Sequence, residues 1–328
     1  MTLKKIKWLL APIFLALLIF VLLQLDRENL LESIAHLPIW LFLLLLFLQV
    51  VTQFLVNLQW YKIAKFTKTK ISFWTMFKIN CKGAVVDAIT PGVKFGGEVA
   101  RAVLLARSAN LSMEKSAAVV ALQKLFSLTS LFAIAILSLA YITATTTFLQ
   151  NLAVKVMIFT ILIFLLTLLL SVFLFPHKLL KLLKSRNRPK RKFFKKIFNF
   201  FVLLLAQSEN LQNDRPMQVK LILLSLAIWI LYPLKLYLLV VWFYPQVNPF
   251  FVVVATFAAY IVAMIPIFPG GVGGFEGIMS SLLMFAGLTA STAAVVTVVF
   301  RFATFWFTLL FSSVIIGVAH LKKRIKYD

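Results

Sequence analysis

Six long apolar runs divide the chain, and their length limits its fold more than any other feature of the sequence. The runs cover residues 8–25, 38–60, 116–142, 153–175, 217–243 and 290–320. An α-helix needs about 20 consecutive apolar residues to cross the hydrocarbon core of a bilayer. Because 62% of all residues are hydrophobic and only 13% are charged, a water-soluble globule would lack polar surface. We therefore predict an all-α integral membrane protein with six spanning helices.

Clusters of lysine and arginine predict the orientation of these runs. The clusters lie within residues 4–7, 62–70, 178–196 and 322–326, and each one directly adjoins an apolar run. Since cytoplasmic loops of membrane proteins are enriched in basic residues, we expect a multi-pass protein of the cytoplasmic membrane with an uncleaved first span and both termini in the cytosol. The net charge of +24 then suits an anionic lipid surface. Nucleic acid is not an expected partner, because no folded soluble domain accompanies the charge.

The densest basic region lies in the segment 176–216. Apolar side chains recur there at helical spacing beside lysines, at Phe193, Phe194, Ile197, Phe198 and Phe201. This pattern is typical of an amphipathic helix on the inner leaflet, and a solvated linker that only enforces the topology is an equal alternative. A segment of about 40 residues is too small to bury a core of its own, so it is not expected to be a catalytic domain.

A short motif occurs twice and interrupts two further apolar segments, 71–112 and 250–288. Residues 91–98 read Pro-Gly-Val-Lys-Phe-Gly-Gly-Glu, and residues 269–276 read Pro-Gly-Gly-Val-Gly-Gly-Phe-Glu. Proline and clustered glycine break a helix, and a break inside a bilayer is tolerated only where protein buries it or a polar cavity adjoins it. The glycine spacing also fits Gly-x-x-x-Gly helix packing. We predict two broken helical hairpins whose tips contain Pro91, Gly92, Gly96, Gly97, Pro269, Gly270, Gly271, Gly273 and Gly274.

The charge pattern gives the two hairpins opposite orientations. The first begins and ends on the cytosolic side, and the second begins and ends outside. We predict a single polytopic domain over 1–328 that contains an inverted repeat. Its two repeats cover about 38–142 and about 217–320, joined by the span 153–175 and the basic cytosolic segment 176–216. Inverted repeats with broken helices are typical of transporters whose binding site lies between the repeats, so the hairpin tips are expected to form two halves of one site.

Charged residues inside the predicted membrane region are mostly cations. They are Lys78, Lys82, Lys94, Arg101, Lys124, Lys235 and Arg301, against the carboxylates Asp87, Glu98 and Glu276. An isolated charge at the bilayer centre costs at least about 2.5 kcal/mol, so several of these groups must face a polar cavity or pair with one another. For Lys78 and Lys82, snorkelling to the inner interface is an equal alternative.

The excess of cations favours an anionic guest such as phosphate, for which arginine offers bidentate contacts. Lys124 follows Glu98 at nearly the same offset at which Arg301 follows Glu276. Glu98 and Glu276 also fall where they could simply cap a helix. The substrate-binding residues that we predict are Glu98, Arg101, Lys124, Lys235, Glu276 and Arg301. With one cysteine and three separated histidines, neither a metal site nor a cofactor is expected.

The two motifs resemble a known family. The pattern T-P-G-x-x-x-G-G-E-x-x-R at 90–101 and the pattern P-x-x-P-G-G-x-G-x-x-E at 266–276 are similar to the flippase-like transmembrane domain of lysylphosphatidylglycerol synthase/flippase proteins, over nearly the whole chain. The resemblance implies a membrane domain that moves lipids with charged headgroups between leaflets. Bifunctional members carry a soluble aminoacyl-transferase domain after the membrane part, whereas this chain stops at Asp328, so the resemblance does not imply lysyl transfer.

We therefore predict a flippase rather than an enzyme, one that moves an anionic or charged-headgroup phospholipid or lipid-linked precursor across the cytoplasmic membrane. Its partners would be the membrane lipid and a separately encoded lipid-modifying enzyme. The alternative is an intramembrane enzyme or synthase subunit that uses Glu98 or Glu276 as a general base on a lipid-linked substrate. A third hypothesis is an accessory protein that anchors a cytosolic partner through residues 176–196.

Overall fold

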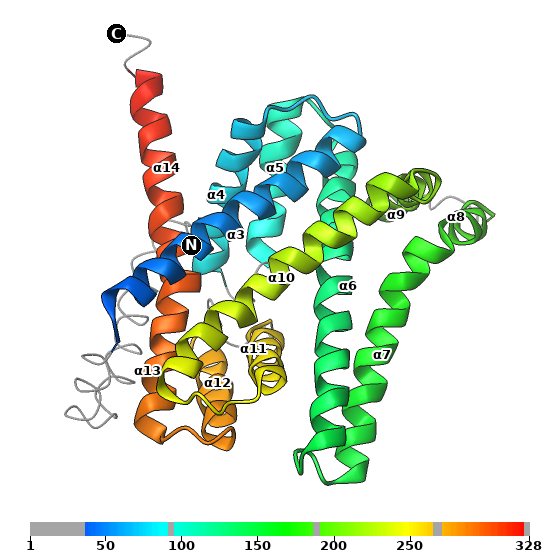
Figure 1. Cartoon of the computed structure of the whole chain (residues 1–328). Coiled ribbons are helices and arrows are strands. Elements are labelled where there is room, and N and C mark those ends of the chain that lie inside the picture. Colours follow the sequence, from blue (N-terminus) through cyan, green and yellow to red (C-terminus); the bar gives the residue numbers. More distant parts are fainter. Residues whose placement is uncertain (1–36, 91–94, 186–190, 265–270, 325–328) are drawn as a thin grey trace. The chain divides into compact units, whose positions relative to one another are not determined.

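The structure is a computed structural model that describes residues 37–90, 95–185, 191–264 and 271–324. The described residues form helices and no strands (Figure 1). The helices are α3 (Ile39–Phe66), α4 (Phe73–Ile89), α5 (Phe95–Ala109), α6 (Met113–Thr145), α7 (Leu152–Leu174), α8 (Pro176–Lys184), α9 (Lys192–Asn213), α10 (Arg215–Phe243), α11 (Pro249–Ala263), α12 (Gly274–Phe285), α13 (Ala290–Arg301), the π-helical turn η1 (Phe302–Trp306) and α14 (Phe307–Arg324).

Five helical stretches are long and apolar enough to cross a membrane. They are Ile39–Phe66, Met113–Thr145, Leu152–Leu174, Arg215–Phe243 and the stretch Ala290–Ala319, which includes η1. The predicted all-α, multi-pass membrane architecture is thereby confirmed. The sixth predicted span, 8–25, lies outside the described residues, so the count of six stays a prediction.

Each predicted broken hairpin contains two short helices, α4 and α5 in the first and α11 and α12 in the second. The helix break is present in both places, since α4 ends at Ile89 before α5 begins at Phe95, and α11 ends at Ala263 before α12 begins at Gly274. Four of the predicted tip residues lie outside the described residues, namely Pro91, Gly92, Pro269 and Gly270. The inverted orientation of the two hairpins stays a prediction.

The chain divides into two compact units, which we describe separately. Unit 1 comprises residues 1–50, 84–97 and 232–328, and unit 2 comprises residues 51–83 and 98–231. Residues 84–97, which include the described part of the first hairpin tip, therefore belong to the same unit as the second hairpin. Within unit 1, α12 packs against both α11 and α13. The ring of Phe275 on α12 stacks on Phe300 of α13 at 6.2 Å.

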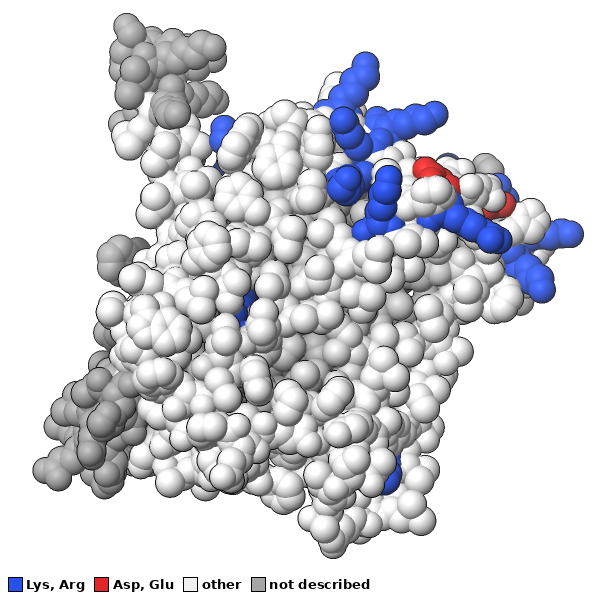
Figure 2. All heavy atoms as spheres, in the orientation of Figure 1, with Lys and Arg blue, Asp and Glu red and all other residues white. Residues whose placement is uncertain are grey.

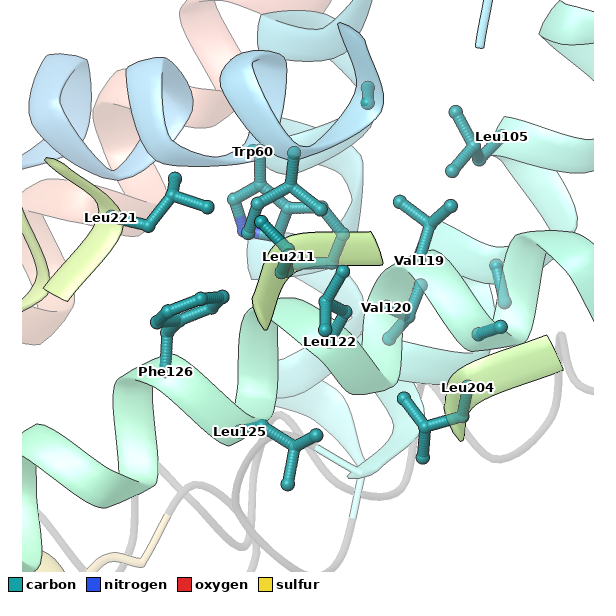
Figure 3. Close-up of a cluster of buried hydrophobic side chains, with 14 of the residues drawn as sticks. Trp60, Leu105, Val119, Val120, Leu122, Leu125, Phe126, Leu204, Leu211 and Leu221 are labelled. Atoms are coloured by element: carbon teal, nitrogen blue, oxygen red, sulfur yellow. The ribbon is translucent and has the colours of Figure 1, made fainter. Parts of the chain in front are cut away.

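The core of unit 2 is built around α6, which packs against α7 and α9. Figure 3 shows part of the cluster of buried side chains that meet there, and its labelled residues come from α3, α5, α6, α9 and α10. Trp60 extends from α3, Phe126 from α6, Leu211 from α9 and Leu221 from α10, and each is at most 3% exposed. In a protein interior such large apolar side chains contribute through close packing, so this cluster holds the helices of unit 2 together.

Buried amides add hydrogen bonds between the helices of unit 2. The Gln123 side chain donates to Gln59 Oε1 at 3.0 Å, which joins α6 to α3. The Asn80 side chain donates to Asn57 Oδ1 at 2.9 Å, which joins α4 to α3. Lipid tails are as apolar as the helices, so association of spanning helices depends on packing and on hydrogen bonds of this kind.

Candidate functional site

In unit 1 the second hairpin presents Glu276 in the first turn of α12. One carboxylate oxygen accepts a hydrogen bond from the backbone N–H of Gly273 at 2.7 Å, and the other lies 3.0 Å from Nε of Arg301. A carboxylate at this position is stabilised by the unpaired N–H groups that begin a helix. Glu276 therefore caps α12 and pairs with Arg301 at the same time, so the two roles considered for it are compatible.

Arg301, the last residue of α13, lies between two aromatic rings. Its guanidinium carbon is 4.4 Å from the centre of the Phe275 ring and 4.3 Å from the centre of the Phe305 ring, and 6% of the side chain is exposed. Aromatic faces attract cations, more strongly where water is excluded. Immediately after Arg301 the helix widens into the π-helical turn η1, a feature that often occurs at functional sites. The arginine is thus held in a fixed position beside Glu276.

The fully buried Lys235 of α10 belongs to a second polar group in unit 1. Its ammonium donates to Oε1 of Gln49 and lies 4.4 Å above the centre of the Tyr232 ring. The Gln49 amide donates in turn to Thr308 Oγ1 at 2.8 Å and to the carbonyl oxygen of Thr304 at 3.3 Å. Gln49 thereby connects the lysine to η1 and α14.

Sequence reasoning missed Gln49 and Thr304, and also Tyr260, whose ring lies 5.1 Å from the ring of Tyr232. Each of the three is an uncharged polar residue inside an apolar run. A polar residue inside an apolar run is a signal that the sequence does contain, because polar side chains at membrane depth usually have hydrogen-bond partners or a function.

In unit 2 the first hairpin presents Glu98 in the first turn of α5. Its Oε1 accepts a hydrogen bond from Lys124 Nζ at 3.0 Å and lies 3.6 Å from Arg101 Nη1. The exposed fractions of these side chains are 17% for Glu98, 29% for Lys124 and 12% for Arg101. Arg101 also lies 5.9 Å from the centre of the Trp60 ring. One carboxylate here faces two cations that are partly open to the surroundings.

The two ion groups have the same construction. Each contains a glutamate in the first turn of a hairpin's second helix and a cation from the helix that follows, Lys124 from α6 or Arg301 from α13. Every predicted substrate-binding residue is described by the structure, and Lys235 is the one that joins neither group. Contact of any of them with a substrate stays a prediction. Within the described parts of the chain, no three His, Cys, Asp or Glu side chains gather as a metal-ligand set.

Glycines in the first hairpin allow its two helices to approach closely. The backbone N–H of Gly97 on α5 donates to Asp87 Oδ1 on α4 at 2.9 Å. A Cβ atom at Gly97 would lie 2.2 Å from the Asp87 carboxyl carbon, and one at Gly96 would lie 2.4 Å from Thr90 Oγ1. A side chain at either place would force the Asp87 or the Thr90 side chain to shift, so both glycines suit the close contact between the helices.

Glycines in the second hairpin serve a different purpose. Gly271 and Gly273 have φ angles of 71° and 87°, in the region that residues with a side chain rarely adopt. A Cβ atom at Gly274 would meet its nearest neighbour, Val262 Cγ1, at an ordinary 3.4 Å. Gly274 aligns with Gly96 in the repeated motif, yet the two positions have different amounts of space.

This difference gives a prediction for two aligned positions. Gly96→Ala is expected to destabilise the protein by about 1–3 kcal/mol. The new methyl group would lie too close to three atoms of the Thr90 side chain, namely Oγ1, Cγ2 and Cβ. Gly274→Ala is expected to change stability by no more than about 1 kcal/mol, since space is available and alanine favours the helix. Thermal unfolding in detergent measures both. Equal effects of the two substitutions would show that close approach is not what the first hairpin requires.

Comparison with known proteins gives one family match and two distant relatives. Residues 8–312 match the family described as the lysylphosphatidylglycerol synthase TM region. The chain is 24% identical to a UPF0104 membrane protein of Methanothermobacter thermautotrophicus over 266 residues, which is 77% of each chain. It is also 24% identical to a UPF0104 membrane protein of Pyrococcus horikoshii over 339 aligned positions, which is 97% of each chain. The family match includes both hairpins and both ion groups.

Proposed function

Since the chain belongs to the family of the lysylphosphatidylglycerol synthase transmembrane region, we propose that it moves a lipid with an anionic or other charged headgroup between the leaflets of the cytoplasmic membrane. The observation that carries this proposal is the pair of ion groups at the hairpins. Placing a charged side chain at membrane depth costs free energy, so a charged residue found there suggests a functional site. A phosphate-bearing headgroup would supply the negative charge that such cations attract.

The group in unit 2 is suited to a first contact with a headgroup. Lys124 and Arg101 both face Glu98, so a phosphate can replace the carboxylate as a partner of either cation without leaving the other uncompensated. Lys124 is the most exposed member of the group. In the absence of lipid, Glu98 holds both cations in position, which lowers the cost of ordering them when a headgroup binds.

The group in unit 1 is suited to orientation. The guanidinium of Arg301 is already fixed by Glu276 and by two aromatic rings. A planar guanidinium can bind two phosphate oxygens at once, which a lysine ammonium cannot do. During transfer the acyl or prenyl tails stay in the surrounding lipid, so only the headgroup requires these polar contacts.

The orientation in the membrane is part of the same proposal. The basic residues at 62–70 and 178–196 adjoin the ends of α3 and α7. From the positive-inside rule we expect both ends to lie in the cytosol. The first hairpin then begins on the cytosolic side. A separately encoded enzyme would make or modify the lipid that is transferred.

Analysis of both the location and the structure of the lipid tests the proposal against its rivals. Purified protein is reconstituted into vesicles that carry a labelled anionic lipid in one leaflet, and the lipid is then extracted for mass spectrometry. Unchanged lipid in the opposite leaflet supports transfer. Covalent change would favour an intramembrane enzyme instead. If the lipid is neither modified nor transferred with any of several headgroups, an accessory role through residues 176–196 would be favoured.

A further inference from the structure

Helices α8 and α9 of unit 2 pack against each other and lie between α7 and α10 in the chain; we call them the α8–α9 hairpin. α8 begins at Pro176, directly after α7 ends at Leu174, and α10 begins at Arg215, directly after α9 ends at Asn213. Gln212 of α9 donates to the carbonyl oxygen of Leu174 at 3.1 Å, and His177 of α8 lies 2.7 Å from the Glu209 carboxylate. The end of α9 is therefore fixed to the end of α7 and to the start of α8.

The apolar face of α9 is buried in the second half of the helix, where it packs against the rest of unit 2. In the first half of the helix the apolar face is exposed. Leu204, Leu205 and Leu211 are buried. The large apolar side chains in the first half are exposed instead, by 50% at Phe194 and 46% at Phe201. Phe194 and Phe201 lie two helical turns apart, and the spacing continues to Leu205, so all three share one side of the helix. The apolar face of α9 thus continues past the part of the helix that other helices of unit 2 cover.

Basic side chains lie on the other faces of the same hairpin. Figure 2 shows Lys and Arg gathered over the end of α3 and over α8 and α9. On α8 the exposed lysines recur every third residue, and on α9 the exposed Lys195 and Lys196 lie across the helix from Phe194 and Phe201. The α8 lysines are Lys178, Lys181 and Lys184. Residues 176–208 contain no aspartate or glutamate, and the acidic Glu209 follows only toward the end of α9, so the charge of this stretch is positive.

We propose that the first half of α9 lies in the interface of an anionic leaflet. Phe194, Ile197 and Phe201 would insert at the boundary between headgroups and acyl chains, while the lysines of α8 and α9 bind lipid phosphates. An apolar face beside a basic face is the pattern of helices that bind anionic membranes. Ile197, which is 39% exposed, completes the apolar face. This role requires only that the chain is inserted in a membrane, so it stands apart from the proposed lipid transfer.

Two single-cysteine variants of the full chain test the inserted face. Cys81 is the one cysteine of the chain and is buried, so a Cys81→Ser background allows labelling at a chosen position. Ile197→Cys places an environment-sensitive fluorophore on the apolar face, and Asn199→Cys places it on the opposite, exposed face as the matched control. Nitroxide on lipid acyl chains and aqueous iodide are the two quenchers, in vesicles with and without phosphatidylglycerol.

With phosphatidylglycerol, the probe at 197 is expected to emit at shorter wavelength than the probe at 199 and to be quenched more by the nitroxide lipid. In purely zwitterionic vesicles, and after Lys178, Lys181, Lys184, Lys195 and Lys196 are replaced by glutamine, this difference is expected to shrink. Equal quenching of both probes by iodide would identify a solvated linker and overturn the proposal. Protection of the probe at 197 from both quenchers would also overturn it, in favour of a protein partner.

Discussion

Arg301→Met is expected to destabilise the protein by about 3–5 kcal/mol, the usual cost of breaking a buried ion pair. The substitution leaves the Glu276 carboxylate, of which 19% is exposed, without the cation that lies 3.0 Å away. It also removes the cation between the rings of Phe275 and Phe305. Chemical unfolding of the purified protein in detergent measures the loss.

A double variant separates the structural part of this effect from the functional part. Glu276→Gln keeps a side chain that can accept the hydrogen bond from the Gly273 N–H, so the helix cap is retained while the charge is removed. Glu276→Gln/Arg301→Met is therefore expected to recover most of the lost stability, because no buried charge is left without its partner. Lipid transfer is expected to be lost in Arg301→Met and also in this double variant. Wild-type transfer by the stable double variant would contradict a functional role for this pair.

Glu98→Gln is expected to slow lipid transfer by roughly tenfold, which corresponds to about 1.4 kcal/mol, the size of one charge-assisted hydrogen bond. The substitution removes the charge that holds Lys124 at 3.0 Å and Arg101 at 3.6 Å. The two cations then repel each other and adopt more conformations, so binding a headgroup requires more ordering. The loss of stability is expected to be smaller than for Arg301→Met, because these side chains are more exposed.

The matched control for this substitution is Glu114→Gln. Glu114 lies in the first turn of α6, also in unit 2, and forms no part of either ion group. Glu114→Gln removes one negative charge from unit 2, as Glu98→Gln does. If the change in net charge alone were the cause, both substitutions would slow transfer equally. Transfer is measured with a labelled anionic lipid in vesicles, at matched amounts of reconstituted protein. An equal effect of the two substitutions would contradict a specific role for Glu98.

The spanning helices could be predicted because a bilayer imposes a length that can be counted in the sequence. The exact helix ends could not be predicted in this way. α3 continues to Phe66, beyond the apolar run that ends at residue 60, because a helix does not have to stop where its side chains become polar. Pro233 does not end a helix either, since α10 continues through it from Arg215 to Phe243. Neighbouring helices and local adjustments can accommodate a proline in a spanning helix.

The sequence does contain a signal that relates Glu98 to Lys124 and Glu276 to Arg301, because the offset between carboxylate and cation is repeated, whereas Arg101 lies outside that offset. The hydrogen bond between Gln49 and Thr308 could not be predicted, since it joins α3 to α14 across most of the chain and no local pattern contains it. The reasons for the glycines were equally hidden. Gly96 allows a close contact, whereas Gly273 allows a positive φ angle. Both requirements are met by glycine, so the sequence does not distinguish them.

The central claim is that the chain transfers lipids with anionic headgroups, and the comparison of headgroups in one set of vesicles tests it most directly. Fluorescent phosphatidylglycerol and fluorescent phosphatidylcholine with the same acyl chains are followed by reduction of the label in the outer leaflet. We expect the protein to accelerate the exchange of phosphatidylglycerol over protein-free vesicles, and to accelerate it more than that of phosphatidylcholine. An exchange rate of the anionic lipid no faster than in protein-free vesicles would contradict the account.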